Sequence, residues 1–380
     1  MASTKQQKRD KRANKGKIDI TFLSFVLILL TIGLVMLFSA SYAYSLEYYG
    51  NSYMFITRQS AFALLGVAVM LLFSRIDYHF WRRFAWIIFI GTLVVLGILL
   101  IMPPMVSGMD VKRWLVIGPI NFQPSEIAKF SVVLLFSSLI AANYKQVKSF
   151  SFIMFMVFLL GMTCVLIVLE PHLSATVLVF CIGVVLLIVG GLPKRYIFGG
   201  IGAGVGGVAL LIISGAISYG SDRIKYWLDP WADPMGKGFQ TIQSLLAIGS
   251  GGILGRGIGQ SRQKYLWVPE PHNDFIFSIV CEELGLIGAA VIILLFCLLI
   301  WRGFTIAMHA PDKFGSLMAL GLTFQVGLQA LLNIWVVTNT IPNTGISLPF
   351  FSYGGTSLVI LLAQMGIVLS VSRGTNIEKI

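Results

Sequence analysis

Charged residues are scarce in this 380-residue chain, and acidic residues are the scarcer kind. Only 12% of the residues are charged, with 16 Asp and Glu in total, whereas 57% are hydrophobic and the mean hydropathy is +0.85. This composition excludes an ordinary soluble domain and is typical of a polytopic membrane protein. The apolar runs are continuous rather than alternating, which excludes a membrane β-barrel and predicts helices.

Cysteine and histidine are also rare, and neither forms a metal-binding pattern. The cysteines all lie inside apolar segments, so we expect packing residues rather than disulfides or metal ligands. The histidines are scattered and predict no metal site, and only His272 neighbours a candidate site. These residues are Cys164, Cys181, Cys281 and Cys297, and His79, His172, His272 and His309. No repeat of fixed period is present.

Basic residues give the chain a net charge of +12, but their placement argues against a nucleic-acid partner. Seven Lys and Arg lie before Ile18, and others stand in pairs or triplets between apolar runs. This pattern is typical of cytoplasmic segments held near anionic lipid. We expect residues 1–17 to be a disordered basic cytoplasmic tail. The apolar run that follows is too long for a signal peptide and predicts an uncleaved first span.

Ten apolar runs of helical length predict ten membrane spans, with both termini in the cytoplasm. Residues 18–373 then form one polytopic domain followed by a C-terminal tail, residues 374–380. A long extracytoplasmic loop, residues 216–274, joins spans seven and eight. This orientation places 18 of the 28 Lys and Arg on the inner side, as the positive-inside rule requires. The predicted spans are 20–42, 59–73, 84–102, 127–142, 152–168, 175–192, 197–215, 275–301, 316–336 and 357–371.

The outer connections hold the Pro, Gly, Trp and acidic clusters, so we expect the working face outside. Asp274 opens the eighth span at the end of a polar segment. It is a candidate catalytic carboxylate or simply the N-cap of that helix. A helix N-terminus favours the carboxylate, whereas desolvation favours the acid, and the sequence leaves the balance open.

A second candidate lies in the run Gln123-Pro-Ser-Glu-Ile-Ala-Lys129. Pro124 suits the first helical position, and Glu126 and Lys129 are three residues apart on one helix face. A charge within the bilayer must face protein or a water-filled cavity, so Lys129 should point inward, paired or facing an anion. The alternative is a Glu–Lys pair that only locks the helix.

Two further features lie on the outer side. Arg58 and Arg113 are either part of a site or anchors to lipid phosphate. The last outer loop, residues 339–357, has no charge and contains two prolines and three glycines. It predicts a re-entrant turn that lines a cavity, or plain loop packing.

Several motifs in order resemble the SEDS family (shape, elongation, division and sporulation proteins) over residues 18–373. They are Lys112-Arg-Trp114, Gln123–Lys129, Asp229-Pro-Trp-Ala-Asp233, Gly238-Phe-Gln240, Pro269–Gly285 and Leu348-Pro-Phe-Phe-Ser-Tyr-Gly-Gly355. Tyr265-Leu-Trp-Val-Pro269 and Pro171-His-Leu-Ser174 are more similar to the division and sporulation branch. At the latter position many family members read Pro-Asp-Leu-Gly, so this chain departs from the pattern there.

The resemblance implies a peptidoglycan glycosyltransferase that polymerises lipid II at the outer face of the bacterial cytoplasmic membrane. It implies a class B penicillin-binding protein, a single-pass transpeptidase, as partner, alongside other division or sporulation membrane proteins. The essential acidic residue of the family matches Asp274, and its Arg-Gln and Glu/Lys positions match Arg58-Gln59 and Glu126/Lys129.

This chemistry agrees with the residues. Transfer from a lipid diphosphate needs a base for the acceptor 4-hydroxyl and positive charge for the leaving group, but no acid. We therefore expect Asp274 to be the general base, the cations to hold diphosphate, Glu126 to orient Lys129, and the donor's anomeric centre to be inverted. A divalent cation such as Mg²⁺ stays an open alternative without a ligand cluster to establish it. The predicted substrate-binding residues are Arg58, Gln59, Arg113, Glu126, Lys129, Arg223, His272 and Ser352.

The rival hypothesis is a flippase that carries lipid II across the membrane. Transport predicts ionisable residues distributed through the membrane depth and on both faces. Here the inner loops are short and the polar cluster is outer, which favours the enzyme. A scaffold that only recruits division proteins would leave Asp274 and Lys129 without a reason to lie near the membrane.

Overall fold

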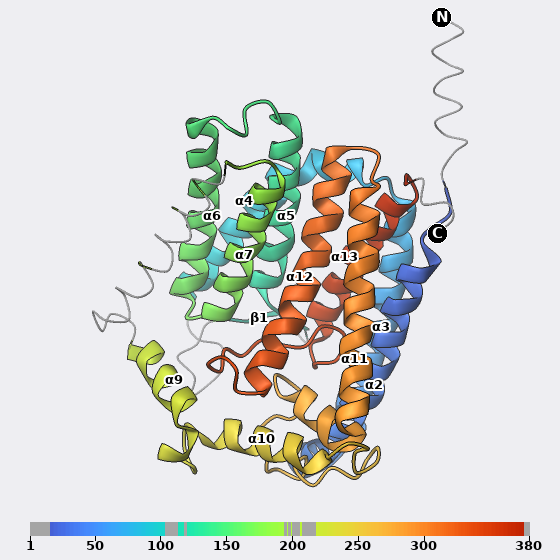
Figure 1. Cartoon of the computed structure of the whole chain (residues 1–380), viewed down its shortest axis with the longest axis vertical. Coiled ribbons are helices and arrows are strands. Elements are labelled where there is room, and N and C mark those ends of the chain that lie inside the picture. The colour runs from blue at the N-terminus through green and yellow to red at the C-terminus, as the bar shows by residue number, and fades with distance from the viewer. Residues whose placement is uncertain are drawn as a thin grey trace, which may run out of the picture.

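The protein is a bundle of long helices in a computed structural model that describes residues 16–102, 113–117, 120–193, 196, 199, 206 and 218–375 (Figure 1). Among these residues, eight helices are long and apolar enough to cross a membrane. They are α2 (Ile20–Tyr49), α3 (Met54–Arg75), α4 (His79–Ile101), α5 (Pro124–Ala142), α6 (Phe150–Leu169), α11 (Ile276–Met308), α12 (Lys313–Val337) and α13 (Gly355–Ser372). A further apolar helix, α7 (Leu173–Val189), has 17 residues.

These helices confirm the prediction of an all-α multi-pass membrane protein. Each matches one predicted span, and the remaining span, residues 197–215, falls outside the described residues except for 199 and 206. Leu64, Ile87 and Phe158 are among many large apolar side chains exposed on the bundle's outer surface. Lipid tails are as apolar as these side chains, so such a surface is stable in a bilayer. The total of ten spans and the domain boundaries stay predictions.

The two described ends of the chain meet at one end of the bundle. The Gly16 N–H donates to the Arg373 carbonyl at 3.0 Å, and the Asp19 N–H donates to the Ser372 hydroxyl at 3.1 Å. Asp19 also pairs with Arg302 at 2.9 Å. The opposite end carries β1 and α10 (Figure 1). This arrangement agrees with termini on one side of the membrane; that the side is cytoplasmic stays a prediction.

The predicted extracytoplasmic loop contains three helical segments among its described residues. It contains α9 (Ser218–Leu228), the 3-10 turn η1 (Pro230–Ala232) and α10 (Phe239–Gly251). Helix α10 lies across the end of the bundle (Figure 1) and packs on α11. Another outer connection forms a short antiparallel hairpin, β1 (Leu115–Ile117) with β2 (Ile120–Phe122), in which Leu115 pairs with Phe122. The sequence did not predict this hairpin.

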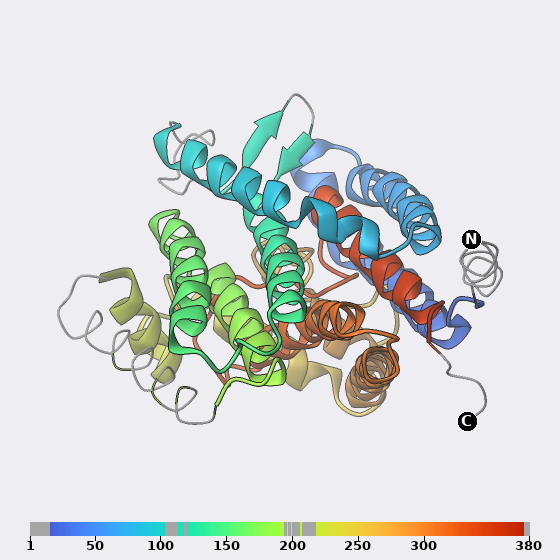
Figure 2. The ribbon, with the colours of Figure 1, turned by 90° about the horizontal axis from the view of Figure 1, so that it is seen from above.

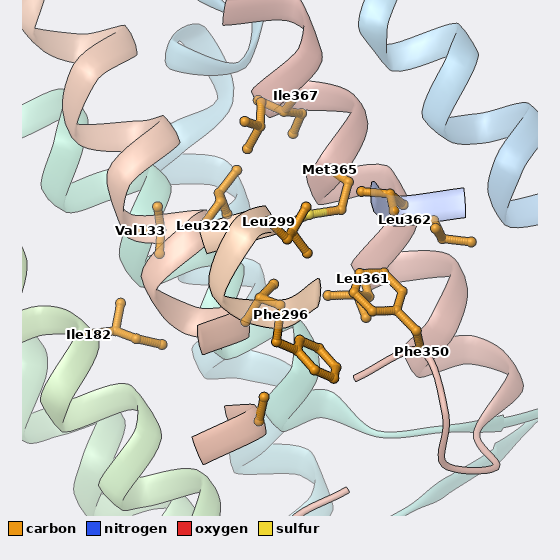
Figure 3. Close-up of a cluster of buried hydrophobic side chains, with 14 of the residues drawn as sticks. Val133, Ile182, Phe296, Leu299, Leu322, Phe350, Leu361, Leu362, Met365 and Ile367 are labelled. Atoms are coloured by element: carbon orange, nitrogen blue, oxygen red, sulfur yellow. The ribbon is translucent and has the colours of Figure 1, made fainter. Parts of the chain in front are cut away.

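The core lies between α5, α11, α12 and α13. Figure 3 shows side chains from these helices meeting, among them Val133, Leu299, Leu322 and Met365. All four side chains are buried. Seen along the bundle, α13 lies beside α2 and α3 on one side, and α6 and α7 lie together on another (Figure 2).

The segment after α10 is fastened to α11 by two buried carboxylates. Glu283 accepts hydrogen bonds from Ser39 at 2.7 Å and from Lys264 at 3.0 Å. Glu282 accepts from the Ser261 hydroxyl at 2.5 Å and from the Arg262 N–H at 2.9 Å. A buried pair with its remaining hydrogen bonds satisfied is held in one geometry, because removing one partner leaves an uncompensated charge. The loop that leads to Asp274 is therefore fixed at its start.

Helix α11 bends where this segment crosses it. Gly285 has φ +67° and ψ −169°, which is not helical. A Cβ at Gly285 would lie 2.2 Å from the Gly255 nitrogen, and a Cβ at Gly255 would lie 2.2 Å from the Glu283 carbonyl oxygen. Only glycine allows the two backbones to approach this closely at positive φ. The sequence predicts one apolar span over residues 275–301. In the structure this span is kinked at Gly285, so its first turns have a different orientation from the rest.

Candidate functional site

A cavity of about 560 Å³ opens among the ends of the helices near the β1–β2 hairpin. Its walls come from the N-terminal ends of α5, α7 and α13, from the residues just before α11, from α3 and α12, from the hairpin segment, and from the loop between α12 and α13. None of these four helix starts has a side-chain cap hydrogen bond. Uncapped helix N-termini carry partial positive charge and free N–H groups, so their convergence favours a bound anion.

Six of the nine predicted site residues line this cavity. They are Arg58, Arg113, Glu126, Lys129, Asp274 and Ser352. The first two come from α3 and the start of the hairpin, the next two from α5, and the last two from the loops before α11 and α13. Segments more than 200 residues apart in the sequence are thus brought to one hollow.

Lys129 is the deepest cation of the cavity wall. Its side chain is 1% exposed, and its Nζ atom donates to Glu126 Oε1 at 2.7 Å and to Gln329 Oε1 at 3.0 Å. The Gln329 amide in turn donates to the Ser347 carbonyl at 3.0 Å, which fixes its orientation. The charge of Lys129 is therefore balanced by a carboxylate and still faces the cavity, as the spacing along α5 predicts.

Asp274 faces the cavity without a hydrogen bond to its carboxylate from any described residue. Its backbone carbonyl accepts from Asn333 Nδ2 at 2.7 Å, which holds the main chain to α12. The N-cap residue of helix α11 is Phe275, so the alternative that Asp274 caps the helix is wrong. A carboxylate held at a cavity wall with its oxygens unused is suited to take a proton from a bound molecule.

Burial decides the acidity of Asp274. Desolvation, and secondly the Glu270 carboxylate, raise its pKa from 3.8 to about 6, against the opposing charges of Arg113 and Arg223. Desolvation is thus the largest effect on its acidity, which the sequence could not decide. A pKa near 6 leaves the group mostly ionised at neutral pH yet far more basic than an ordinary aspartate.

Arg58 and Arg113 line the cavity from two different segments. Arg58 is exposed on the second turn of α3. Arg113 donates from Nη2 to the carbonyl of Pro171, while its Nε is buried without a hydrogen-bond partner among the described residues. Ser352 also lines the cavity, and its hydroxyl donates to the Asn273 carbonyl at 2.8 Å and accepts from the Leu348 N–H at 2.7 Å.

Three predicted residues lie outside the cavity lining. Gln59 is buried behind it, donating to the Ser352 carbonyl at 3.3 Å and accepting from the Gly354 N–H at 3.2 Å. His272 is 3% exposed and packs on the rings of Tyr44 and Phe55 with centroids 4.9 and 4.3 Å away. Burial lowers the pKa of His272 to about 4, so it is a neutral packing residue.

Arg223 is the third predicted residue that does not line the cavity. It lies on α9, and its charge lowers the pKa of Asp274 and of His172. The described residues contain no group of three or more His, Cys, Asp or Glu side chains that could hold a metal ion. Among these residues the donor set for a divalent cation is incomplete.

Comparison with known proteins places this geometry in a family. The family model of the cell cycle proteins FtsW, RodA and SpoVE matches residues 20–377. The chain belongs to the FtsW/RodA/SpoVE family.

Its similarity to members of this family extends over nearly their whole length. Stage V sporulation protein E of Bacillus subtilis is 39% identical over 367 residues, covering 94% of this chain and 98% of the relative. A probable peptidoglycan glycosyltransferase FtsW of Geobacter sp. (strain M18) is 37% identical over 358 residues, covering 93% and 96%.

Solved structures share the fold. A chain from a peptidoglycan synthase complex that coordinates polymerization and crosslinking superposes with a TM-score of 0.76 at 27% identity, covering 95% of this chain and 99% of that one. The rod shape determining protein RodA of Thermus thermophilus superposes with a TM-score of 0.70 at 26% identity, covering 95% and 98%. These likenesses confirm the resemblance to the SEDS family and the multi-pass membrane fold.

Four lining or supporting residues of this FtsW/RodA/SpoVE protein escaped the sequence reasoning. Gln329 and Asn333 lie one turn apart on α12, and buried amides in an otherwise apolar span are a signal that would have found them. His172 lines the cavity within the Pro-His-Leu-Ser motif, where the departure from the family pattern was visible. Glu270, at φ +44°, accepts from Asn273 Nδ2 at 2.8 Å, and only the folded loop brings it to Asp274.

Proposed function

We propose that this FtsW/RodA/SpoVE protein is a peptidoglycan glycosyltransferase that polymerises lipid II at the outer face of the cytoplasmic membrane. The observation that carries the proposal is the carboxylate of Asp274, which accepts no hydrogen bond from a described residue, in a cavity that Lys129, Arg58 and Arg113 also line. A base and a set of cations in one hollow are what glycosyl transfer from a diphosphate requires. The names of the relatives and of the synthase complex support the same reaction.

In the proposed reaction Asp274 accepts the proton of the acceptor sugar's 4-hydroxyl. The oxygen attacks the anomeric carbon of the donor, the bond from that carbon to the diphosphate oxygen breaks, and its electron pair leaves with the diphosphate. The new glycosidic bond has the inverted configuration. With a pKa raised to about 6, Asp274 is ionised at neutral pH and basic enough to assist.

The cations act where the leaving group gains charge. Lys129, fixed by Glu126 and Gln329, offers a preorganised positive charge that needs no rearrangement during the reaction. Arg58 and Arg113 supply mobile and planar donors for phosphoryl oxygens. Glu126 would thus orient Lys129 rather than act on substrate.

The flippase alternative is less well supported. A transport path needs ionisable groups through the depth of the bundle. Below the cavity, the buried polar pair between α12 and α13 is Gln325 with Gln364, whose amides meet at 3.0 Å. Neither of these groups can carry a proton or a charge, whereas the ionisable groups around Asp274 gather at one end.

The deciding experiment uses the purified protein with its transpeptidase and labelled lipid II. Glycan strands should form with the wild type, and Asp274→Asn should abolish them while membrane insertion and partner binding stay intact. An Asn variant that polymerises at the wild-type rate would remove Asp274 from the base role. Lipid II that changes leaflet without polymer would favour the flippase. Repeating the assay with EDTA decides whether a divalent cation takes part.

We also propose a single-pass class B penicillin-binding protein as the partner. The solved relative comes from a complex that couples polymerization to crosslinking, and the outer helix faces here are apolar enough to receive another transmembrane helix. Relatives named for sporulation and for FtsW support either a sporulation or a division role. Co-purification of tagged protein from dividing and from sporulating cells would separate the two.

A further inference from the structure

His172 is the one histidine of the chain that lines the cavity. Its side chain is only 7% exposed, and it stands at the start of α7, whose first N–H groups have no side-chain cap. The mechanism above does not use it. A buried imidazole that faces a cavity wall is either a packing residue, as His272 is, or a contact for the bound molecule.

One ring nitrogen of His172 has a polar neighbour among the described residues. The Nδ1 atom of His172 lies 3.4 Å from the hydroxyl of Ser125, which is buried at the second position of α5. Among the described residues that hydroxyl has no other hydrogen-bond partner. A hydroxyl that donates to Nδ1 leaves the ring's own proton on Nε2, an atom without a hydrogen-bond partner among the described residues.

The charges around the ring select the ligand. Burial and the positive charges of Arg113, Lys129 and Arg223 lower the pKa of His172 to about 3, so the imidazole is neutral. Arg113 also donates to the carbonyl of Pro171, beside the ring, and leaves its own Nε buried and unpartnered among the described residues. Arg113 and His172 line the same cavity as the N-terminal ends of α5 and α7, and such a group of donors fits an anion.

We propose that His172 and Arg113 form a subsite that binds a phosphoryl oxygen of a lipid-linked diphosphate, with Ser125 as the positioning residue that holds Nε2–H toward it. The proposal rests on the proposed function, which supplies the diphosphate as substrate class. The neutral imidazole of His172 contributes a hydrogen bond near Lys129, which is paired with Glu126. It adds no positive charge that would retain the diphosphate product. In this arrangement His172 and Arg113 bind the diphosphate, and this role does not fall to Lys129, whose charge is already shared with Glu126.

The test measures binding of polyprenyl diphosphate without a sugar to the purified full chain, so it does not depend on polymerisation. His172→Ala should weaken this binding roughly tenfold to hundredfold, the range for a hydrogen bond to a charged acceptor. His172→Gln, whose amide can still donate, should recover part of the affinity. His309→Ala, at an exposed histidine, is the control and should leave it unchanged.

Ser125 gives an independent arm of the test. Ser125→Ala alone should weaken diphosphate binding several-fold, and the double variant with His172→Ala should bind no worse than His172→Ala alone, because Ser125 acts through the ring. Additive losses would overturn the positioning role. If His172→Ala unfolds in detergent, His172→Gln and Ser125→Ala carry the same comparison.

The outcomes also distinguish the subsite from the proposed function. Wild-type affinity for polyprenyl diphosphate in the His172 variants would overturn the subsite, even if the protein polymerises lipid II. A loss seen only with sugar-bearing lipid II would overturn it too, because the contact would then be to the sugar. If the His172 variants bind diphosphate more weakly but the wild-type protein makes no polymer, the subsite is upheld and the proposed function is rejected.

Discussion

Replacing Asp274 by Asn should stabilise the fold while it abolishes the proposed reaction. The folded protein raises the pKa of Asp274 from 3.8 to about 6, mainly through desolvation. An acid whose pKa is raised in the folded state lowers the free energy of unfolding once it ionises. The stability of the fold therefore decreases as the pH rises from about 4 to about 6. At pH 7.5 the ionised carboxylate therefore costs about 1–3 kcal/mol, since one pKa unit corresponds to about 1.4 kcal/mol and partial exposure reduces the full value.

Thermal unfolding in detergent micelles measures this gain. The Asn variant should melt several degrees higher than the wild type at pH 7.5, and the difference should shrink to roughly a third at pH 4.5. Glu47→Gln, at an exposed carboxylate on α2, is the matched control and should change neither value. An Asn variant that melts below the wild type at pH 7.5, or a difference independent of pH, would refute the claim that Asp274 is held desolvated.

Further expectations concern the neighbours of Asp274. Glu270→Gln should move the acid limb of the pH–rate profile down by less than about one unit, because burial is the larger cause of the raised pKa, and Arg113→Gln should move it up. Lys129→Met should slow lipid II polymerisation roughly hundredfold or more at unchanged expression, and a rate within twofold of wild type would contradict its role. Gly345 has φ +69° and an added Cβ would lie 3.3 Å from Asp274 Oδ2, so Gly345→Ala should destabilise the fold by about 1 kcal/mol and slow polymerisation in the same assays.

The membrane fold could be predicted because it follows from composition and length. Continuous apolar runs specify helices wherever backbone groups cannot reach water, and the described helices match nine of the predicted spans. The predicted span ends at residue 42, whereas α2 continues to Tyr49, because Ser45 and Glu47 look like part of a loop. On the same helix, Ser39 is buried and is held by Glu283 from 244 residues away. Such a contact is tertiary and leaves no local pattern.

The site could be predicted where its functional residues lie a few positions apart in the sequence. The three-residue separation of Glu126 and Lys129 fixes their pairing on α5 whatever the rest of the chain does. Gln59 and His272 illustrate the limit, because adjacency to Arg58 and to Asp274 says nothing about which side chain faces the cavity. Neither lines it: Gln59 accepts from the backbone N–H of Gly354, and His272 packs on the ring of Phe55. Which side chain faces the cavity is decided by packing between segments that are distant in sequence.

The pH dependence of lipid II polymerisation by the wild-type protein tests the central claim most directly. With Asp274 as the base, kcat/KM should fall tenfold per pH unit below about pH 6, in line with the raised pKa of that carboxyl. A profile that stays level down to pH 4.5, while the protein remains folded, would show that a different group accepts the proton.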